Sequence, residues 1–366
     1  MAKSFHWIGL LLVIHLLILT SGVSLLKQTE PATAWLAFVS SRDGNSELYR
    51  LDFDGKNLTR LTDNFIWDSS PVWSPDGQWI VFQSDRDGNL ELYRMRPAGS
   101  HIERLTFATK IDSQPSWSPD GQWIAFQSSR DGNPELYRMH PDGGSLQRLT
   151  INTETDTKPS WSPDGRWISF MSNRDDSWEL YRMASDGSDL QQLTHFSGND
   201  LDPRWSPDSQ FISFYEYADD ISTLYLMSFS ENDLRQLSFP PGNNTNSSWS
   251  PDGQWIVFQS DRNGNWDLFR IHPDGSGLEQ LTDHPQHDNM PEWSPDGRWI
   301  VFQSYRSGNW DIYRMLPDGS HLQQLTDDKQ NDNLPVWSPP IDLPWNPLWL
   351  FILTLIIVAV SVWKRI

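Results

Sequence analysis

The sequence predicts an all-β fold, a seven-bladed β-propeller of four-stranded antiparallel blades, from three observations. A Trp-Ser-Pro phrase, usually completed as Trp-Ser-Pro-Asp-Gly, recurs every 44 residues without insertion or deletion. Such a period indicates an array of one supersecondary unit. Each unit contains four short apolar runs separated by turn residues, as antiparallel strands require. The last unit supplies only the strand that the first unit lacks, so the array can close into a ring.

The repeated phrase predicts the order of strands within one unit. Its tryptophan stands at Trp73, Trp117, Trp161, Trp205, Trp249, Trp293 and Trp337. In the unit at 71–106 we expect strands at 71–74, 79–82, 92–95 and 102–106. Pro-Asp-Gly and Asp-Gly-Asn between them are turn sequences, because proline presets φ and glycine accepts positive φ. Aromatic and β-branched residues dominate the second run, which is typical of a buried strand.

The two ends of the array predict how the ring closes. Trp35 aligns with Trp79, so the first unit has its second, third and fourth strands but no Trp-Ser-Pro strand. The last phrase, at 335–339, is such a strand with no unit after it. We therefore expect the first blade to be closed by the C-terminal strand, which leaves no open edge. The unit at 203–238 lacks the usual Asp-Gly-Asn turn and is expected to be a variant blade.

Apolar runs at both ends of the chain predict membrane helices. Residues 7–26 and 345–363 are each about long enough to span a bilayer, which needs roughly 20 residues. Basic residues lie outside both runs, which by the positive-inside rule places both termini in the cytoplasm and the array outside it. A cleaved secretory signal is the alternative for the first run. The expected organisation is an N-terminal anchor or signal at 1–27, a propeller at 28–340 and a C-terminal helix at 341–366.

Composition excludes several functions. The net charge is −20, which argues against a nucleic-acid partner, because phosphates demand a basic face. The chain has no cysteine, so neither disulfides nor thiolate metal sites are available. We find no Gly-x-Ser-x-Gly elbow, P-loop or dinucleotide fingerprint, and therefore expect no catalytic residues, metal or cofactor.

The repeat resembles a known family. Trp-Ser-Pro-Asp-Gly, an aromatic strand, Ser-x-Arg-Asp-Gly, Leu-Tyr and a closing Leu-Thr together resemble the TolB-type, WD-like β-propeller repeat. The resemblance covers seven units and implies the propeller fold, while propellers of this type serve as binding platforms, sugar-active enzymes and peptidase gates. TolB carries a further α/β domain before its propeller, whereas only eight residues separate Leu26 from Trp35 here. We therefore expect a TolB-like protein and not TolB itself.

Alternating strands sort the connections onto two faces. The Ser-Pro-Asp-Gly and Pro-Asp-Gly-Ser turns form the bottom face, and the Arg-Asp-Gly-Asn turns and the links between blades form the top face. An acid recurs in the top links at Asp68, Asp112, Asp156, Asp200, Asp288 and Asp332, with Asn244 in the remaining unit. An arginine recurs in the top turns at Arg42, Arg86, Arg130, Arg174, Arg262 and Arg306, with Ala218 in the remaining unit. The acids are candidate ligand-binding residues; alternatively, they pair with the arginines to tie adjacent blades.

Three tryptophans on the top face form a second candidate ligand patch, since aromatics are favoured at contact hot spots. They are Trp178, Trp266 and Trp310, and packing against the neighbouring blade is the alternative. His284 and His287 could ligate a metal, but no third ligand of a matching kind is evident. The turns lack the 12-residue calcium-loop pattern.

The leading functional hypothesis is a membrane-anchored, extracytoplasmic propeller that acts as a binding platform for a protein or a cell-envelope polymer. The alternative is an envelope glycan lyase or hydrolase with its site in the top mouth of the channel. A third hypothesis is a purely structural envelope protein without a ligand. An enzyme requires a residue cluster confined to one or two blades, and only His284, His287 and the variant blade are candidates.

Overall fold

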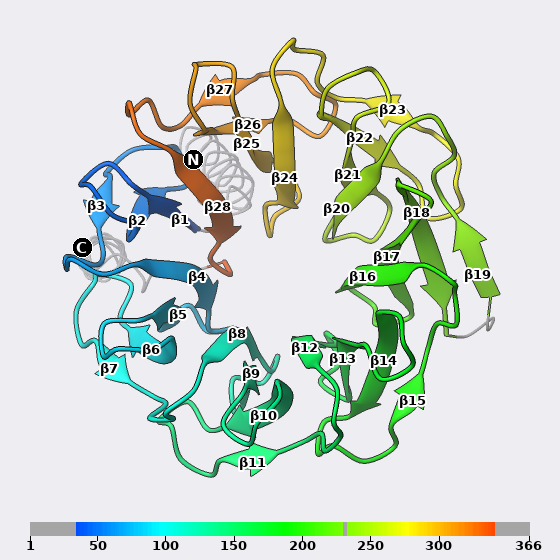
Figure 1. Cartoon of the computed structure of the whole chain (residues 1–366). Coiled ribbons are helices and arrows are strands. Elements are labelled where there is room, and N and C mark those ends of the chain that lie inside the picture. The colour runs from blue at the N-terminus through cyan, green and yellow to red at the C-terminus, as the bar shows by residue number, and fades with distance from the viewer. Residues whose placement is uncertain (1–33, 230–232, 341–366) are drawn as a thin grey trace, which may run out of the picture. The chain divides into compact units, whose positions relative to one another are not determined.

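The computed structural model describes residues 34–229 and 233–340. These residues form seven four-stranded antiparallel sheets, arranged as the blades of a ring (Figure 1). The prediction of a seven-bladed propeller is therefore confirmed. The predicted membrane helices, at 7–26 and 345–363, lie outside the described residues. Within the described ranges no helix is both long and apolar enough to cross a bilayer.

Each blade contributes one strand to each of four concentric positions. The inner strands, which end at the repeated tryptophan, are β28 (Asp332–Trp337), β4 (Asp68–Trp73), β8 (Asp112–Trp117), β12 (Asp156–Trp161), β16 (Asn199–Trp205), β20 (Asn244–Trp249) and β24 (Asp288–Trp293) in blades 1 to 7. The second strands are β1 (Trp35–Ser40), β5 (Ile80–Ser84), β9 (Ile124–Ser128), β13 (Trp167–Ser172), β17 (Phe211–Ala218), β21 (Ile256–Ser260) and β25 (Ile300–Ser304). The third strands are β2 (Glu47–Asp52), β6 (Glu91–Met95), β10 (Glu135–Met139), β14 (Glu179–Ala184), β18 (Ile221–Ser228), β22 (Asp267–Ile271) and β26 (Asp311–Met315). The outer strands are β3 (Thr59–Arg60), β7 (Glu103–Arg104), β11 (Gln147–Arg148), β15 (Gln191–Gln192), β19 (Asp233–Gln236), β23 (Glu279–Gln280) and β27 (Gln323–Gln324).

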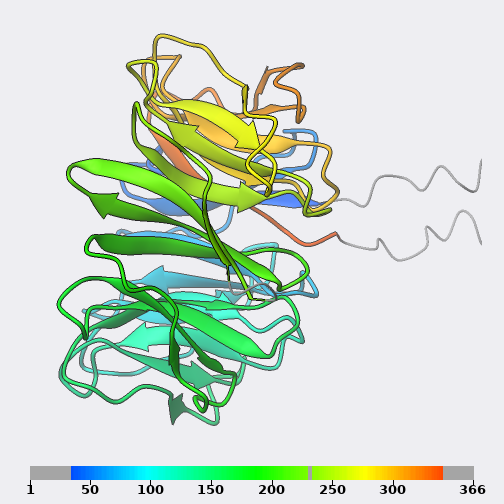
Figure 2. The ribbon, with the colours of Figure 1, turned by 90° about the vertical axis from the view of Figure 1, so that its right-hand side faces the viewer.

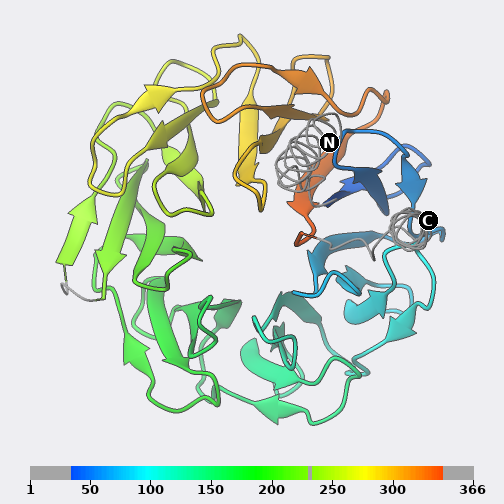
Figure 3. The same cartoon turned by 180° about the vertical axis from the view of Figure 1, so that it is seen from behind.

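Blade 1 is assembled from both ends of the propeller. The C-terminal strand β28 pairs antiparallel with β1, with Leu36 opposite Trp337 and Ser40 opposite Asp332. Beyond the ladder, Ser338 N–H donates to the Trp35 carbonyl (2.7 Å), and Trp35 N–H donates to Ser338 Oγ (2.8 Å). Figures 1 and 3 show β28 beside β1 from opposite sides. The predicted closure is confirmed.

The inner strands begin earlier than the sequence predicts. In blade 2 the inner strand starts at Asp68 and not at residue 71, so the recurring acid opens the strand and does not lie in the preceding link. The strand includes a bulge, seen as a register shift between Ser69 and Val72. Proline cannot donate a ladder hydrogen bond, and it is tolerated here because the strand is an edge strand and is bulged. A search for runs of apolar residues misses the start of this strand, because its first three residues are polar.

The hydrophobic core lies between adjacent blades. One phenylalanine from each second strand is fully buried: Phe38, Phe82, Phe126, Phe170, Phe214, Phe258 and Phe302. Each packs in a cluster drawn from two neighbouring blades, as where Leu48 and Leu61 of blade 1 meet Trp73 and Phe82 of blade 2. Burying such a side chain stabilises the fold by roughly 1.5–3 kcal/mol. A blade therefore depends on its neighbours for its core, which explains why the ring must close.

The connections lie on two opposite faces, visible when the ring is seen from the side (Figure 2). Blade 5 is the predicted variant, and its strands β17 and β18 each have eight residues, more than their counterparts in the other blades. The two strands meet at Asp219 and Asp220, whose φ values are 50° and 63°. The 44-residue frame is kept, but blade 5 has a longer hairpin on the top face.

Candidate functional site

The recurring acids on the top face are buried and paired with the recurring arginines. In blade 2, Arg86 donates from one terminal nitrogen to both Asp68 oxygens (2.9 and 2.8 Å) and from Nε to Ser84 Oγ (2.8 Å). Asp68 has no exposed surface, and the guanidinium lies 4.7 Å from the Tyr93 ring centre. The same pair forms between Arg42 and Asp332, Arg130 and Asp112, Arg174 and Asp156, and Arg306 and Asp288. In blade 6, Arg262 donates to Asn244 instead (2.7 Å).

Each of these acids also joins its blade to the preceding one. The N–H of Asp68 donates to the carbonyl of Ser46 in blade 1 (2.9 Å). Asn64, in the link, donates from Nδ2 to Asp68 (2.7 Å) and from its backbone to Glu47 of blade 1 (2.9 Å). The side-chain ion pair therefore lies within one blade, while the backbone and Asn64 bridge two. These five acids thus form the ion pairs that the alternative interpretation expects, although one Asp112 oxygen has no hydrogen-bond partner among the described residues.

Asp200 is the exception among the six acids. The arginine that pairs with its counterparts is replaced by Ala218 in this blade. Asp200 has no exposed surface, and neither carboxylate oxygen has a hydrogen-bond partner among the described residues. The Thr194 hydroxyl donates instead to the neighbouring Glu179 (2.8 Å). Burial, with repulsion from the neighbouring carboxylates, raises the pKa of Asp200 to about 8.

Phe196 takes the place of the missing arginine of blade 5. Its ring centre lies 5.0 Å from that of Tyr225 and 6.3 Å from that of Phe214. In blade 4 the guanidinium of Arg174 lies over the equivalent pair, 4.5 Å from the Tyr181 ring centre. At this position blade 5 therefore has an aromatic side chain over the Phe-Tyr pair, where the other blades have an arginine.

The three candidate tryptophans are half-buried and lie in different blades. The backbone N–H of Trp178 donates to Asn199 Oδ1, and that of Trp310 donates to Asn331 Oδ1 (both 3.1 Å). Trp266 N–H donates to His287 Nδ1 (3.2 Å). Trp178 packs against the core cluster of blades 4 and 5, as the packing alternative expects.

The two histidines that were considered as metal ligands, His284 and His287, accept hydrogen bonds from the backbone. His284 Nδ1 accepts from the Gln286 N–H (3.1 Å), and His287 Nδ1 accepts from Trp266. Among residues 34–229 and 233–340, no three His, Asp or Glu side chains are grouped to hold a metal.

The central channel carries the feature that the sequence interpretation missed. In every inner strand the residue two positions after the recurring acid, or after Asn244 in blade 6, adopts a left-handed conformation, with φ between 51° and 57°, although none is glycine. These residues are Ser70, Gln114, Lys158, Asp202, Asn246, Met290 and Leu334. Such a conformation costs about 1 kcal/mol or more for a side chain of this kind. Each instance coincides with the bulge that interrupts its inner strand.

The channel lining breaks the sevenfold repeat. Around the ring, the residues four positions after the recurring acid, or after Asn244, are Val72, Ser116, Ser160, Arg204, Ser248, Glu292 and Val336. Two of these are charged and two are β-branched apolar residues, while the remaining three are the small serine. Together with the residues in the left-handed conformation, they divide the channel into a charged side, from blades 4, 5 and 7, and an apolar side, from blades 7, 1 and 2.

The charged side is a series of long ion pairs that links Lys158, Asp202, Arg204 and Glu292. Lys158 Nζ lies 3.4 Å from Asp202, whose second oxygen lies 3.5 Å from Arg204 Nε. The Arg204 guanidinium then reaches Glu292 across blade 6 (3.7 Å), and Ser248 Oγ donates to Glu292 (3.0 Å). These contacts are longer than the 2.7–2.9 Å pairs inside the blades, and Arg204 keeps 44% of its side-chain surface exposed. Its guanidinium is therefore available to a ligand.

Electrostatics favour the charged form of both partners in this chain. Burial would raise the pKa of Asp202, but Arg204 and Lys158 together hold it below its ordinary value. The nearby Asp202 carboxylate raises the pKa of Arg204. Burial raises the pKa of Glu292, although Arg204 opposes that effect. The channel thus holds a permanent charge pair, with a second carboxylate at its edge.

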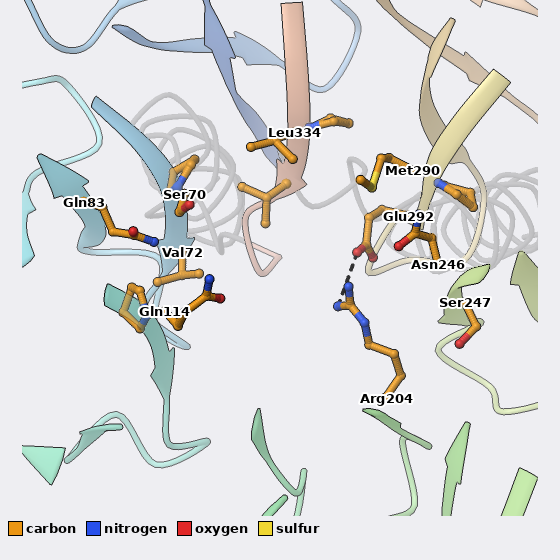
Figure 4. Close-up of a pocket in the computed structure, with 15 residues that line it drawn as sticks. Ser70, Val72, Gln83, Gln114, Arg204, Asn246, Ser247, Met290, Glu292 and Leu334 are labelled. Atoms are coloured by element: carbon orange, nitrogen blue, oxygen red, sulfur yellow. Dashed lines mark ion pairs between the residues drawn. The ribbon is translucent and has the colours of Figure 1, made fainter. Parts of the chain in front are cut away.

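A cavity of about 270 Å³ lies between the charged and apolar sides. Figure 4 shows Arg204 and Glu292 pointing toward one another, with Val72 and Gln114 on the facing side. Met290 and Leu334 line the same cavity. A second cavity of about 490 Å³, lined by Lys158, Asp202 and Arg204 among others, lies against the inner strands of blades 2 to 5. A ligand with an apolar part and a charged part fits this lining.

Comparison with known proteins agrees with the repeat. The family model described as the TolB beta propeller domain matches residues 21–114, 109–214 and 190–339, most of the chain. The chain belongs to this TolB propeller family. A short segment is 46% identical over 48 residues to the Tol-Pal system protein TolB of Geobacter sulfurreducens, which is 13% of this chain and 11% of that protein. The match therefore spans about a tenth of that relative, and the chain is TolB-like and not TolB itself.

Two solved structures share the TolB-like propeller fold. The putative TolB from Agrobacterium tumefaciens has a TM-score of 0.51 at 25% identity, over 64% of this chain and 86% of that chain. The oligogalacturonate lyase from Vibrio parahaemolyticus has a TM-score of 0.63 at 17% identity, over 76% of this chain and 85% of that chain. The second likeness shows the fold alone.

Proposed function

We propose that this chain is a membrane-anchored, extracytoplasmic propeller that binds a protein segment or a cell-envelope polymer in its central channel. The apolar runs at 7–26 and 345–363, each with basic residues on its outer side, support the anchoring. The net charge of −20 suits a solvated body held off an anionic membrane surface. The ring holds the binding residues in fixed positions, as a platform requires.

The observation that carries this proposal is the broken symmetry of the channel. Inner strands that otherwise repeat closely carry Arg204 and Glu292 on one side and Val72 and Val336 on the other. Two large charged groups in loose contact are not needed to hold the ring, since serine occupies the same position in blades 3, 4 and 6. A half-exposed guanidinium favours a carboxylate of the ligand, which it can bind through two hydrogen bonds. The apolar side supplies the surface that such a ligand buries.

Photocrosslinking in intact cells tests the binding site. A photoreactive phenylalanine analogue at Leu334, 41% exposed in the channel, is expected to give one discrete adduct with an envelope protein or polymer. The matched control carries the analogue at Leu322, 46% exposed at the edge of blade 7, and is expected to give none. Equal adducts from both positions would mean that the channel is not the binding site.

Cysteine labelling tests the location, and the natural chain contains no cysteine to interfere. Single cysteines at Glu154 on the top face and Asp318 on the bottom face, both exposed, are expected to react with a membrane-impermeant maleimide once the outer surface is accessible. A cysteine at Lys364 is expected to react only after the cytoplasmic membrane is permeabilised. Reaction at Lys364 without reaction at Glu154 would reverse the proposed orientation.

A further inference from the structure

The exposed apolar side chains of the propeller fall into two groups, distinguished by whether they repeat. One group recurs at the same position of every unit: Leu58, Ile102, Leu146, Leu190, Leu234, Leu278 and Leu322. A residue type that every blade carries at one position belongs to the construction of the blade. The other group stands at positions that are apolar in only some of the units, and its members lie on the top face or in the channel. Repetition explains the first group but not the second.

Most of the second group lies in three consecutive links, those that leave blades 1, 2 and 3. We define the apolar arc as Phe65, Trp67, Phe107, Ile111 and Ile151, which are 99%, 44%, 73%, 48% and 81% exposed. The links that leave blades 6 and 7 have the same length but carry Asp-His-Pro-Gln-His and Asp-Asp-Lys-Gln-Asn. Links of the same length are thus built with polar side chains, so the apolar side chains of the arc are not needed to form the link. Exposing several large apolar groups together is unfavourable unless a partner covers them.

The backbone that presents the arc is held in place. In the first link, Ile66 N–H donates to Asn64 Oδ1, and Asn45 Nδ2 donates to the Ile66 carbonyl (both 2.7 Å). In the second link, the Arg104 guanidinium lies 4.8 Å from the Phe107 ring centre. Phe65 and Trp67 flank a residue fixed from both sides and are therefore displayed on a rigid frame. A preorganised surface loses little conformational entropy when it binds.

The charges around the arc indicate the chemistry of what covers it. The top turns of blades 1 to 3 carry Asp43, Asp87 and Asp131, which are 43%, 43% and 47% exposed, and Asp63 in the first link is 82% exposed. Each of these aspartates forms an ion pair with Arg60, Arg104 or Arg148, whose side chains are less exposed (30%, 24% and 27%). The arc is thus an apolar surface with a mainly acidic border. An anionic lipid surface is disfavoured by these carboxylates, whereas a basic polypeptide is favoured.

We propose that the apolar arc is a second docking surface, separate from the channel, for a polypeptide partner with an apolar centre and a basic border. The arc residues stand in links, whereas the channel residues stand on inner strands, so the two surfaces can be occupied independently. The aromatic members act as anchors, because large aromatic side chains contribute most to protein contacts. The acidic border orients the partner and accelerates its approach.

Peptides of defined chemistry test the proposal on the full-length chain in nanodiscs. Three synthetic peptides of equal length alternate Phe with Lys, Gly with Lys, or Phe with Glu, and binding is followed by fluorescence anisotropy. Only the Phe-Lys peptide is expected to bind through the arc, since the channel guanidinium favours the carboxylates of the Phe-Glu peptide. The variant F65S/F107S/I151S is expected to weaken it by about tenfold or more. The matched variant L146S/L190S/L322S removes recurring apolar side chains and is expected to leave the affinity unchanged, as is the channel variant R204S.

Each other outcome overturns the proposal. Equal binding of the Gly-Lys peptide would mean that charge alone attracts the partner. Equal affinity in F65S/F107S/I151S would mean that the arc does not contact it. Binding of phosphatidylcholine–phosphatidylglycerol vesicles through the arc, lost in the same variant, would assign the surface to lipid instead. The R204S variant changes only the channel, and the triple variant F65S/F107S/I151S changes only the arc. A negative result for the arc therefore does not count against binding in the channel, and a negative result for the channel does not count against the arc. An unchanged midpoint of thermal unfolding in both triple variants verifies that the fold is intact.

Discussion

Replacing Arg86 with alanine is expected to lower the free energy of unfolding by about 3–5 kcal/mol. The substitution removes the guanidinium that donates to both oxygens of Asp68, a carboxylate with no exposed surface. It also removes the donor to Ser84 Oγ and the contact over Tyr93. An uncompensated buried charge is left at the point where blades 1 and 2 join. Chemical denaturation followed by tryptophan fluorescence measures the change.

Two further variants separate charge from packing. Arg166 is 80% exposed and its contact with Asp164 is long (3.8 Å), so R166A is expected to change the stability by less than ~0.5 kcal/mol. The double variant R86A/D68N removes the stranded charge and is expected to recover part of the loss. Asparagine is tolerated in this setting, since Asn244 occupies it in blade 6. A loss for R86A no larger than that for R166A would show that these ion pairs do not hold the blades.

Replacing Asp200 with asparagine is expected to stabilise the protein increasingly as the pH rises from about 4 to 8. Unfolded Asp200 ionises near its ordinary value of about 3.9, whereas burial raises the pKa in the folded state to about 8. Between these values the folded protein holds a proton that the unfolded chain has released, so the natural protein loses stability as the pH rises. The linkage amounts to about 1.4 kcal/mol for each pH unit between the two pKa values. Asparagine does not titrate and escapes this loss.

The matched control for this prediction is Asp186→Asn. Asp186 is exposed on a bottom turn, where hydrogen bonds from Ser188 lower its pKa. Its replacement is expected to give no gain as the pH rises. Unfolding midpoints in denaturant at pH 5, 6, 7 and 8 would reveal the difference between the two variants. A constant difference between D200N and the natural protein over this range would contradict the assignment of a protonated Asp200.

The sequence was sufficient for the architecture because the information is repeated. A single unit gives an ambiguous strand assignment, but the same tryptophan at seven positions 44 residues apart leaves one interpretation. Ring closure followed from one missing strand and one surplus strand, and β28 fills the predicted place beside β1. Strand ends were less predictable. The inner strand of blade 2 starts at Asp68 because a bulge carries the ladder past Pro71, and no hydrophobic pattern marks such a bulge.

The candidate site was predictable only in part. The recurrence of an aspartate and an arginine in nearly every unit correctly indicated pairs such as Asp68–Arg86. That recurrence alone does not reveal that the aspartate is fully buried. The channel residues were available as a signal, because the positions two and four residues after the recurring acid vary from blade to blade. Their meaning required the left-handed bulge, since it is the structure that shows Arg204 and Glu292 facing each other across a cavity. Side chains from blades 5 and 7 are 88 positions apart in the sequence, beyond the reach of local patterns.

The most direct test of channel binding is photocrosslinking from Leu334 in a variant whose two charged channel residues, Arg204 and Glu292, are replaced by serine. The variant R204S/E292S places at two positions the serine that blades 3, 4 and 6 already carry, so the ring is expected to fold as before. We expect the adduct formed from Leu334 in the natural channel to disappear in this variant. An adduct that persists undiminished would contradict binding in the channel, and a glycan that the natural protein degrades and the variant does not would contradict the role of a binding platform.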